Sequence, residues 1–319
     1  MLTKLVSLVL FILVMFNGKG VAFSANSEQA DPENPYKVTI NLASTTLTLF
    51  MDGKKLYEFP VAVGSVATPT PCGRFKIFDK EVNPEWQDPK DLKKIVKSGP
   101  DNPLGYRWMA FYGAYGMHGT NAPWAIGNYV SNGCVRMHNA DAETVYDLVP
   151  VGTPVQIYYE RVILESDKDN NTSVGIYPDS YGTEPLSELD IKNKLVELGV
   201  YAFIPDEEIE DRVGGSWEPV PIGKVYPVEI NDLWIKGKYV EQNGQAYLPV
   251  TVVANILKVK ADWDPDSGMI KTQYGTAPGY VIKNIVFFNP ADAETLFKAK
   301  GTINDKNIYC LKNIEVPVK

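Results

Sequence analysis

An Asp-Gly pair between two short strand-like runs is the feature that most restricts how this chain can fold. Asp52 and Gly53 separate residues 46–51 from residues 54–59, and both runs carry strand-forming aromatic and apolar side chains. Asp-Gly favours the two-residue turns that join adjacent antiparallel strands. Similar runs, separated by turn residues, occur at 37–42, 74–78, 108–112 and 153–159. The pattern predicts a mainly β domain over residues 36–160.

Two helical segments interrupt this β pattern. The first, at 140–149, is expected to be a short helix within the β domain. The second, at 186–198, follows Ser187, a typical N-cap, and is closed by Gly199, a typical helix end. Residues 161–225 are therefore predicted to be a linker with one helical segment.

Length and composition exclude several classes of protein. The chain has 319 residues, which is enough for two domains. Its 45% apolar content argues against a disordered protein. The net charge of −8 provides no excess of basic residues, so no nucleic-acid partner is predicted.

The N-terminus has the pattern of an export signal. Lys4 precedes an apolar run at 5–16, and small residues follow before Ala25. This predicts a signal peptide over residues 1–25, followed by a polar tether at 26–35. The alternative is an uncleaved membrane anchor. Both interpretations place the rest of the chain outside the cytoplasm, as a secreted, cell-wall or periplasmic protein.

The reactive side chains are few and concentrated. The chain has two histidines and three cysteines, and both histidines lie with Cys134 in residues 118–139. So few ligands predict no metal site, and no cofactor is expected. An odd number of cysteines in an exported protein leaves at least one free thiol. Cys310 is expected to be a core residue, and Cys72 to be inert or to pair with Cys134 under oxidation.

Cys134 has neighbours that fit a nucleophile. His118 or His138 could remove the thiol proton, because the pKa of histidine lies near neutrality. Gly133 allows a tight turn, so that backbone N–H groups could face a developing oxyanion. From residue types alone, a small buried hydrophobe remains the alternative for Cys134, and a capping or packing role the alternative for His138.

The longer motif is more specific. His118-Gly119-Thr120, followed by Ser131-x-Gly133-Cys134-Val135-Arg136-Met137, resembles the signature of the L,D-transpeptidases, the family with a YkuD-type catalytic domain. The segments at 68–75, 102–105 and 152–155 also resemble that family, so the likeness covers residues 36–160. It implies a β-sandwich with a short helix, acting on the peptide stems of bacterial peptidoglycan.

The resemblance implies a role for each motif residue. Cys134 would be the nucleophile and His118 its base, with the Gly119 carbonyl orienting the imidazole. The N–H groups of Gly133 and Cys134 would form the oxyanion hole. Four residues are expected to bind substrate: Arg136, Ser131, Asn132 and Trp124. Many family members carry a second histidine at the position of Asn132, and Asn132 cannot act as a base.

The expected function is an exported cysteine L,D-transpeptidase that forms 3→3 peptidoglycan cross-links through a thioester on Cys134. Such an enzyme contributes to cell-wall organisation and cell shape and is a carbapenem target. Its partners would be a donor tetrapeptide stem and an acceptor amine. The alternatives are an L,D-carboxypeptidase that trims stems with water, and a non-catalytic wall-binding protein.

Residues 226–319 alternate strand-like runs with an expected helix at 250–257, which predicts a small α+β domain. Within it, residues 228–271 are similar to the module named after the N-terminal domain of copper amine oxidases. This segment has no histidine, so no copper is predicted. By analogy the domain would contact the wall or another protein, or act as a spacer.

Overall fold

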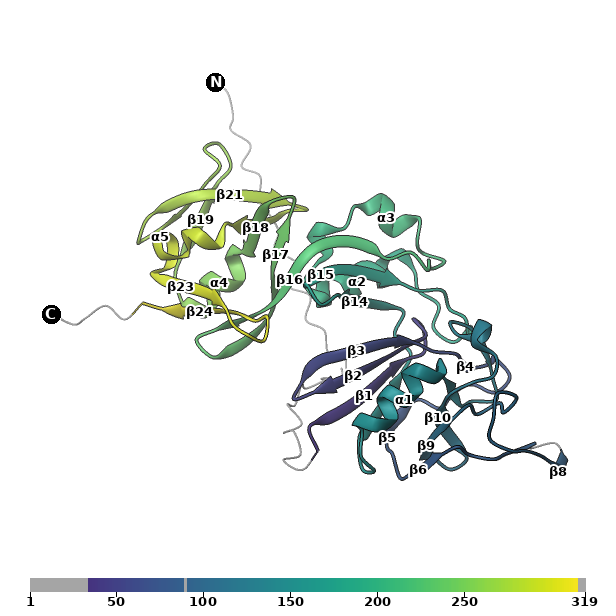
Figure 1. Cartoon of the computed structure of the whole chain (residues 1–319). Coiled ribbons are helices and arrows are strands. Elements are labelled where there is room, and N and C mark those ends of the chain that lie inside the picture. The colour runs from purple at the N-terminus through teal and green to yellow at the C-terminus, as the bar shows by residue number, and fades with distance from the viewer. Residues whose placement is uncertain (1–33, 89–90, 315–319) are drawn as a thin grey trace, which may run out of the picture.

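The structure, a computed structural model, describes residues 34–88 and 91–314 (Figure 1). The expected signal peptide, and all but two residues of the expected tether, lie outside the described residues. Strands dominate and the helices are short, which confirms the predicted mainly β fold. Among the described residues, no helix has the length and apolar character needed to cross a bilayer.

The first sheet contains the hairpin that the sequence predicts. Asp52 and Gly53 both have positive φ, at 51° and 74°, as the turn between two antiparallel strands requires. The strand order is β3-β2-β1-β13-β5, and β13 runs parallel to β1. The strands are β1 (Tyr36–Asn41), β2 (Thr46–Met51), β3 (Lys54–Pro60), β5 (Gly73–Lys76) and β13 (Pro154–Tyr158).

A second sheet shares a core with the first. Its order is β12-β10-β9-β6, and helix α1 (Asn139–Leu148) packs against β9 and β10 (Figure 1). Its strands are β6 (Asp79–Val82), β9 (Arg107–Tyr112), β10 (Tyr115–His118) and β12 (Val135–Arg136). Fully buried residues from both sheets meet in one cluster, including Ile40, Leu49, Met109, Met117 and Val135. Two packed sheets with one short helix agree with the expected sandwich.

Short pairs of strands lie beside this core. Strand β4 (Val63–Gly64) pairs with β11 (Tyr129–Ser131), which leads into the turn before Cys134. Strands β7 (Trp86–Asp88) and β8 (Asp91–Val96) form a hairpin that extends away from the sheets (Figure 1).

The prediction of a linker over residues 161–225 is wrong. The helical segment is present as α2 (Glu188–Leu198), with Ser187 as N-cap and Gly199 as C-cap. The residues around it, however, form strands of an 11-stranded sheet that continues to the C-terminal region. The path of that sheet is β14 (Val162–Ser166), β15 (Asn171–Ile176), β16 (Val220–Ile230), β17 (Leu233–Gln242), β18 (Gln245–Pro249), β22 (Ile285–Phe288), β21 (Thr276–Ile282), β20 (Met269–Thr272) and β19 (Ala261–Asp264).

The continuous sheet carries its own helices and cores. Helices α4 (Val250–Leu257) and α5 (Ala293–Phe297) pack in one apolar cluster. Strands β23 (Ala299–Ile303) and β24 (Tyr309–Asn313) join the sheet through β16. Helices α2 and α3 (Asp206–Glu210) belong to a second cluster, which begins at Val162. The described residues from 162 onward therefore form a structured α+β unit rather than a linker and a domain.

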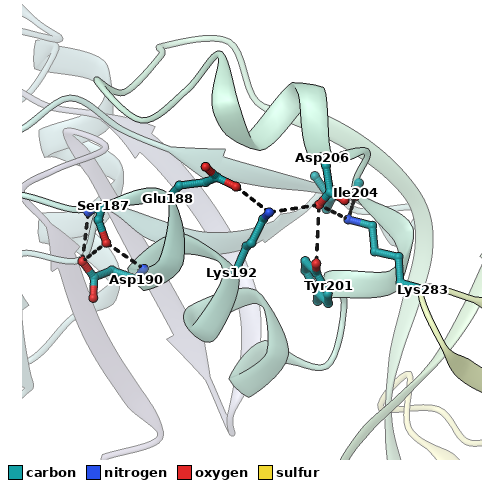
Figure 2. A network of polar contacts seen from close by, with 8 residues as sticks. All are labelled: Ser187, Glu188, Asp190, Lys192, Tyr201, Ile204, Asp206 and Lys283. Atoms are coloured by element: carbon teal, nitrogen blue, oxygen red, sulfur yellow. Dashed lines mark hydrogen bonds and ion pairs between the residues drawn. The ribbon is translucent and has the colours of Figure 1, made fainter.

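A polar network joins α3 to the turn between β21 and β22 (Figure 2). The ammonium of Lys283, in the turn between β21 and β22, donates to the Ile204 carbonyl at 2.6 Å and to the Asp206 carboxylate at 2.7 Å. It also lies 4.1 Å from the centre of the Tyr201 ring. Lys192 of α2 approaches the same carboxylate at 3.6 Å. Residues separated by about eighty positions in the sequence thus meet at one carboxylate.

Candidate active site

The strand register brings His118 and Arg136, two predicted site residues, together with Trp108. His118 pairs with Arg136 of β12 on one side and with Trp108 of β9 on the other. Paired residues point to the same face of a sheet, and their sequence neighbours point to the opposite face. The neighbours Met117 and Val135 are fully buried in the core. His118, Arg136 and Trp108 therefore lie together on the face that is turned away from the core.

The imidazole of His118 is held in one tautomer. Its Nδ1 lies 2.6 Å from the carbonyl oxygen of Gly119, which can only accept a hydrogen bond. Nδ1 therefore carries the proton, and Nε2 is the nitrogen that can accept one. The indole of Trp108 stacks on the ring at 5.5 Å between centroids. The contact with the Gly119 carbonyl is the one that the sequence predicts.

Burial sets the charge of His118. Only 4% of the residue is exposed, and this desolvation lowers its pKa to about 4, although the hydrogen bond to Gly119 acts in the opposite direction. The positive charge of Arg136 lowers the pKa further. At neutral pH the imidazole is therefore uncharged and available as a proton acceptor.

The thiol of Cys134 has a backbone partner for each protonation state. Its S–H donates to the Ala114 carbonyl, with 3.7 Å between sulfur and oxygen. Burial raises the pKa of the thiol, while the backbone N–H of Gly116 and the charge of Arg136 lower it. The N–H and the cation favour a thiolate once it forms. Arg136 is thus the charge that acts on both His118 and Cys134.

Glycine is required at position 116 by its neighbours. A Cβ there would lie 2.7 Å from the indole of Trp108. The same indole stacks on His118, so the absence of a side chain at Gly116 lets Trp108 cover the imidazole.

Ser131 organises the turn that carries Cys134. Its hydroxyl accepts a hydrogen bond from the Gly133 N–H at 3.0 Å and donates to the Cys134 carbonyl at 2.6 Å. Ser131 is 1% exposed. Its expected contact with substrate is therefore replaced by a role within the turn. Because the Gly133 N–H is already bonded, the oxyanion pair expected from Gly133 and Cys134 is reduced to the Cys134 N–H in this conformation.

Gly133 has a second reason to be glycine. Its φ of +109° lies in a region that other residues rarely adopt. A Cβ at this position would also lie 2.3 Å from the ring of Tyr115. The tight turn before the thiol is the feature that the sequence predicts for this residue.

The segment at 65–70 supports Ser131 from outside the motif. The Ser131 carbonyl accepts from the Ser65 N–H at 2.9 Å and from the Thr68 hydroxyl at 3.1 Å. The Thr70 hydroxyl in turn accepts from the Gly64 N–H at 2.9 Å. This segment, which overlaps the family-like stretch at 68–75, therefore holds the strand that ends at the nucleophile turn.

Asn139 is a site residue that sequence reasoning missed. Its Oδ1 accepts a hydrogen bond from the Thr120 N–H at 2.9 Å. A Cβ at either Gly105 or Gly119 would lie 2.1 Å from the same oxygen. Asn139, at the start of α1, therefore fixes the turn that supplies the Gly119 carbonyl to His118. The sequence offered one indication, since Asn139 is a polar residue at the end of the stretch 118–139 that holds the reactive side chains.

The remaining candidates lie nearer the surface. Trp124, in a 3-10 turn, is 79% exposed, and Asn132 is exposed at the tip of the nucleophile turn. His138 occupies the N-cap position of α1, but its side chain makes no capping hydrogen bond. Cys72 and Cys134 are both free thiols. Within the part of the chain that the structure describes, no three His, Cys, Asp or Glu side chains form a metal-binding group.

The region that contains this site matches a known protein family. The family model of the YkuD L,D-transpeptidase catalytic domain matches residues 35–157. YqjB of Bacillus subtilis (strain 168), which is named as an L,D-transpeptidase, is 39% identical over 133 residues, a match that covers 40% of this chain and 72% of YqjB. The chain belongs to the L,D-transpeptidase family. The matched residues contain both sheets and the whole of the site described above.

Other L,D-transpeptidases also match part of the chain. YkuD of Bacillus subtilis (strain 168) is 36% identical over 124 residues, covering 39% of this chain and 66% of YkuD. A solved L,D-transpeptidase from Mycobacterium smegmatis has 23% identity and a TM-score of 0.34, covering 39% of this chain and 59% of that one. The chain thus spans less than two thirds of each of these two proteins. The family match ends before the α+β unit begins.

Proposed function

We propose that this L,D-transpeptidase family member is an exported enzyme that forms 3→3 peptidoglycan cross-links through a thioester on Cys134. The observation that carries the proposal is the common face of β10 and β12. There the charge of Arg136 acts on both the Cys134 thiol and His118, whose Nε2 is free to accept a proton. These are the parts that acyl transfer by a cysteine needs.

In the first step both groups start uncharged. Cys134 gives its proton to Nε2 of His118 as its sulfur attacks the carbonyl that joins the L-centre of the stem diamino acid to the terminal D-Ala. The Cys134 N–H and the positive charge of Arg136 favour the developing oxyanion. D-Ala leaves as an amine that takes the proton from His118, and a thioester remains.

In the second step a side-chain amine of another stem attacks the thioester. His118 takes the proton from this amine, the C–S bond breaks and the protein regains its thiol when the proton returns to sulfur. The product is a 3→3 amide cross-link. Arg136 and Asn132 would hold polar groups of the donor stem, and the exposed Trp124 would contact the peptide from the rim.

Export is part of the proposal, because the substrate lies outside the cytoplasm. It is supported by the pattern of residues 1–25, a charged start followed by an apolar run. We assign the protein to the extracytoplasmic space on that basis. The α+β unit would meet the wall or another protein there.

Exposure to a carbapenem followed by intact-protein mass spectrometry tests the proposal. The chain from residue 26 is expected to gain one adduct, and Cys134→Ala none. His118→Gln, which keeps the thiol and removes the base, should acylate on the order of 10²–10⁴ times more slowly. An unmodified parent protein, freshly reduced, would contradict a catalytic role for Cys134 and favour the wall-binding alternative.

Incubation with tetrapeptide muropeptides then identifies the reaction. Cross-linked dimers that appear with the parent and not with Cys134→Ala support the transpeptidase. Tripeptide stems without dimers would show that water resolves the thioester, and would replace the proposal with an L,D-carboxypeptidase.

A further inference from the structure

The loop between β15 and α2 reaches the nucleophile turn from outside the family match. It contains Tyr181, whose hydroxyl donates a hydrogen bond to the Gly64 carbonyl at 2.8 Å. The Tyr181 ring packs edge-on against Tyr129, with 5.0 Å between centroids. Gly64 belongs to β4 and Tyr129 to β11, and β4 and β11 pair with each other. One side chain therefore contacts both strands that hold Ser131.

A short series of hydrogen bonds connects this contact with Cys134. The Gly64 N–H donates to Thr70, and the Thr68 hydroxyl donates to the Ser131 carbonyl. The Ser131 hydroxyl donates to the carbonyl of Cys134. The chain itself joins Thr70 to Thr68 through Pro69, and Gly64 also pairs with Ser131 across the two strands. We therefore expect a shift of β4 to reach the turn that carries the thiol.

The loop itself is firmly held. Arg161 is 4% exposed, and its guanidinium donates to the Tyr177 carbonyl and to the Glu184 carbonyl, each at 2.7 Å. The Asp179 carboxylate accepts from the Tyr159 hydroxyl at 3.0 Å and from the Glu184 N–H at 2.8 Å. Both ends and the interior of the loop are therefore fixed.

The loop also belongs to both parts of the molecule. Tyr177 packs in the core of the two catalytic sheets, and the preceding residue, Ile176, packs in the core of the α+β unit. The Ile176 carbonyl accepts from the Ser216 N–H at 2.7 Å. The position of Tyr181 thus depends on the α+β unit as well as on the catalytic domain.

We infer that residues 177–184 form a brace, and that Tyr181 is a positioning residue that holds the β4–β11 strand pair and, through Ser131, the Cys134 turn. The inference rests on the proposed function, because it takes Cys134 as the reacting group. The inference means that the α+β unit helps to position Cys134, through a residue that lies outside the catalytic domain.

Tyr181→Phe is the direct test, because it removes the hydroxyl and keeps the ring. Tyr201→Phe is the matched control, since it removes a hydroxyl that donates to Asp206 within the α+β unit. In the full chain from residue 26, the rate of Cys134 alkylation by iodoacetamide is followed by peptide mass spectrometry across pH, and the rate of carbapenem acylation is measured beside it. Tyr181→Phe should slow both by roughly tenfold, because misplacing reacting groups is costly.

Two further measurements separate positioning from general stability. Hydrogen exchange in peptides covering 127–139 should be faster in Tyr181→Phe and unchanged in Tyr201→Phe. Asp179→Asn weakens the hydrogen bonds that hold the loop but keeps the Tyr181 side chain. It should also slow alkylation, by a smaller factor. This variant carries the test if Tyr181→Phe does not fold.

The outcomes distinguish the inference from the proposed function. If carbapenem leaves the parent unmodified but Tyr181→Phe still slows alkylation of Cys134, the brace stands and the transpeptidase proposal fails. If the parent is acylated and Tyr181→Phe matches it in rate and pH profile, the brace is wrong. A loss of rate that Tyr201→Phe reproduces would also overturn it.

Discussion

At the scale of single residues, the site depends on a histidine that is kept neutral by burial. Arg136 on the neighbouring strand adds to this effect, because its charge disfavours an imidazolium and favours a thiolate. The same charge therefore keeps the base unprotonated and makes loss of the thiol proton easier. In the proposed reaction, the uncharged imidazole takes the thiol proton as the sulfur attacks.

The buried histidine predicts how stability depends on pH. The pKa of His118 is about 4 in the folded protein and near 6.5 in the unfolded chain. Below pH 6.5 the unfolded state binds a proton that the folded state excludes, so the free energy of unfolding falls as the pH is lowered toward 4. The loss from this group is about 3 kcal/mol. Urea unfolding at a series of pH values measures it.

His118→Gln is the control for this titration. The substitution changes no other ionisable side chain, so the difference between parent and variant isolates His118. The difference in unfolding free energy should change between pH 7 and pH 4 and stay constant above pH 7. A constant difference over the whole range would show that folding leaves the pKa of His118 unchanged.

The motif around Cys134, with the family resemblance that it carries, gave the main site prediction. His118 and Arg136 pair across adjacent strands, and Cys134 directly precedes the strand that carries Arg136. Asn139 and Tyr181 were missed because their roles come from contacts with Thr120 and Gly64, which no local pattern encodes.

At the scale of elements, local turn and cap chemistry was predictable. The Asp-Gly hairpin and the ends of α2 follow from residues with strong conformational preferences. The first part of β16 falls in the expected linker, because proline is unfavourable inside a strand. Pro221 and Pro227 lie beside irregularities in the pairing of β16, where a missing N–H is tolerated. The pairing of these segments with distant strands makes them part of a sheet, and local sequence does not reveal that pairing.

The start of α1 gives a prediction at this scale. Asn139→Ala removes the acceptor for the Thr120 N–H and leaves a gap beside Gly105 and Gly119. We expect the free energy of unfolding to fall by about 1–3 kcal/mol, because a buried donor loses its partner. Carbapenem acylation of Cys134 should also slow, because the Gly119 carbonyl no longer fixes the imidazole.

Asn139→Asp is the matched variant, because it keeps an oxygen at the same position. It should retain most of the stability and most of the acylation rate. Urea unfolding and acylation kinetics on the three proteins decide the matter. Equal acylation by the parent and Asn139→Ala would show that α1 does not position His118.

At the scale of the whole molecule, the chain consists of a catalytic domain and an α+β unit that share the brace at 177–184. The 11-stranded sheet runs without interruption from β14 to β19. The two apolar clusters of the α+β unit lie along that sheet, and both contribute residues from its strands. We therefore expect residues 162–314 to unfold cooperatively and separately from the core of the catalytic sheets.

The network around Lys283 tests this division (Figure 2). Lys283→Met keeps the length of the side chain and removes the bonds to Ile204 and Asp206, so the α+β unit should melt at a lower temperature. Lys306→Met is the control, since Lys306 is exposed. Calorimetry with hydrogen exchange should place the change in the α+β unit, while acylation of Cys134 at 25 °C stays at the parent rate. If Lys283→Met and Lys306→Met melt alike, the network does not stabilise the unit; if the catalytic core melts earlier too, the two parts unfold together.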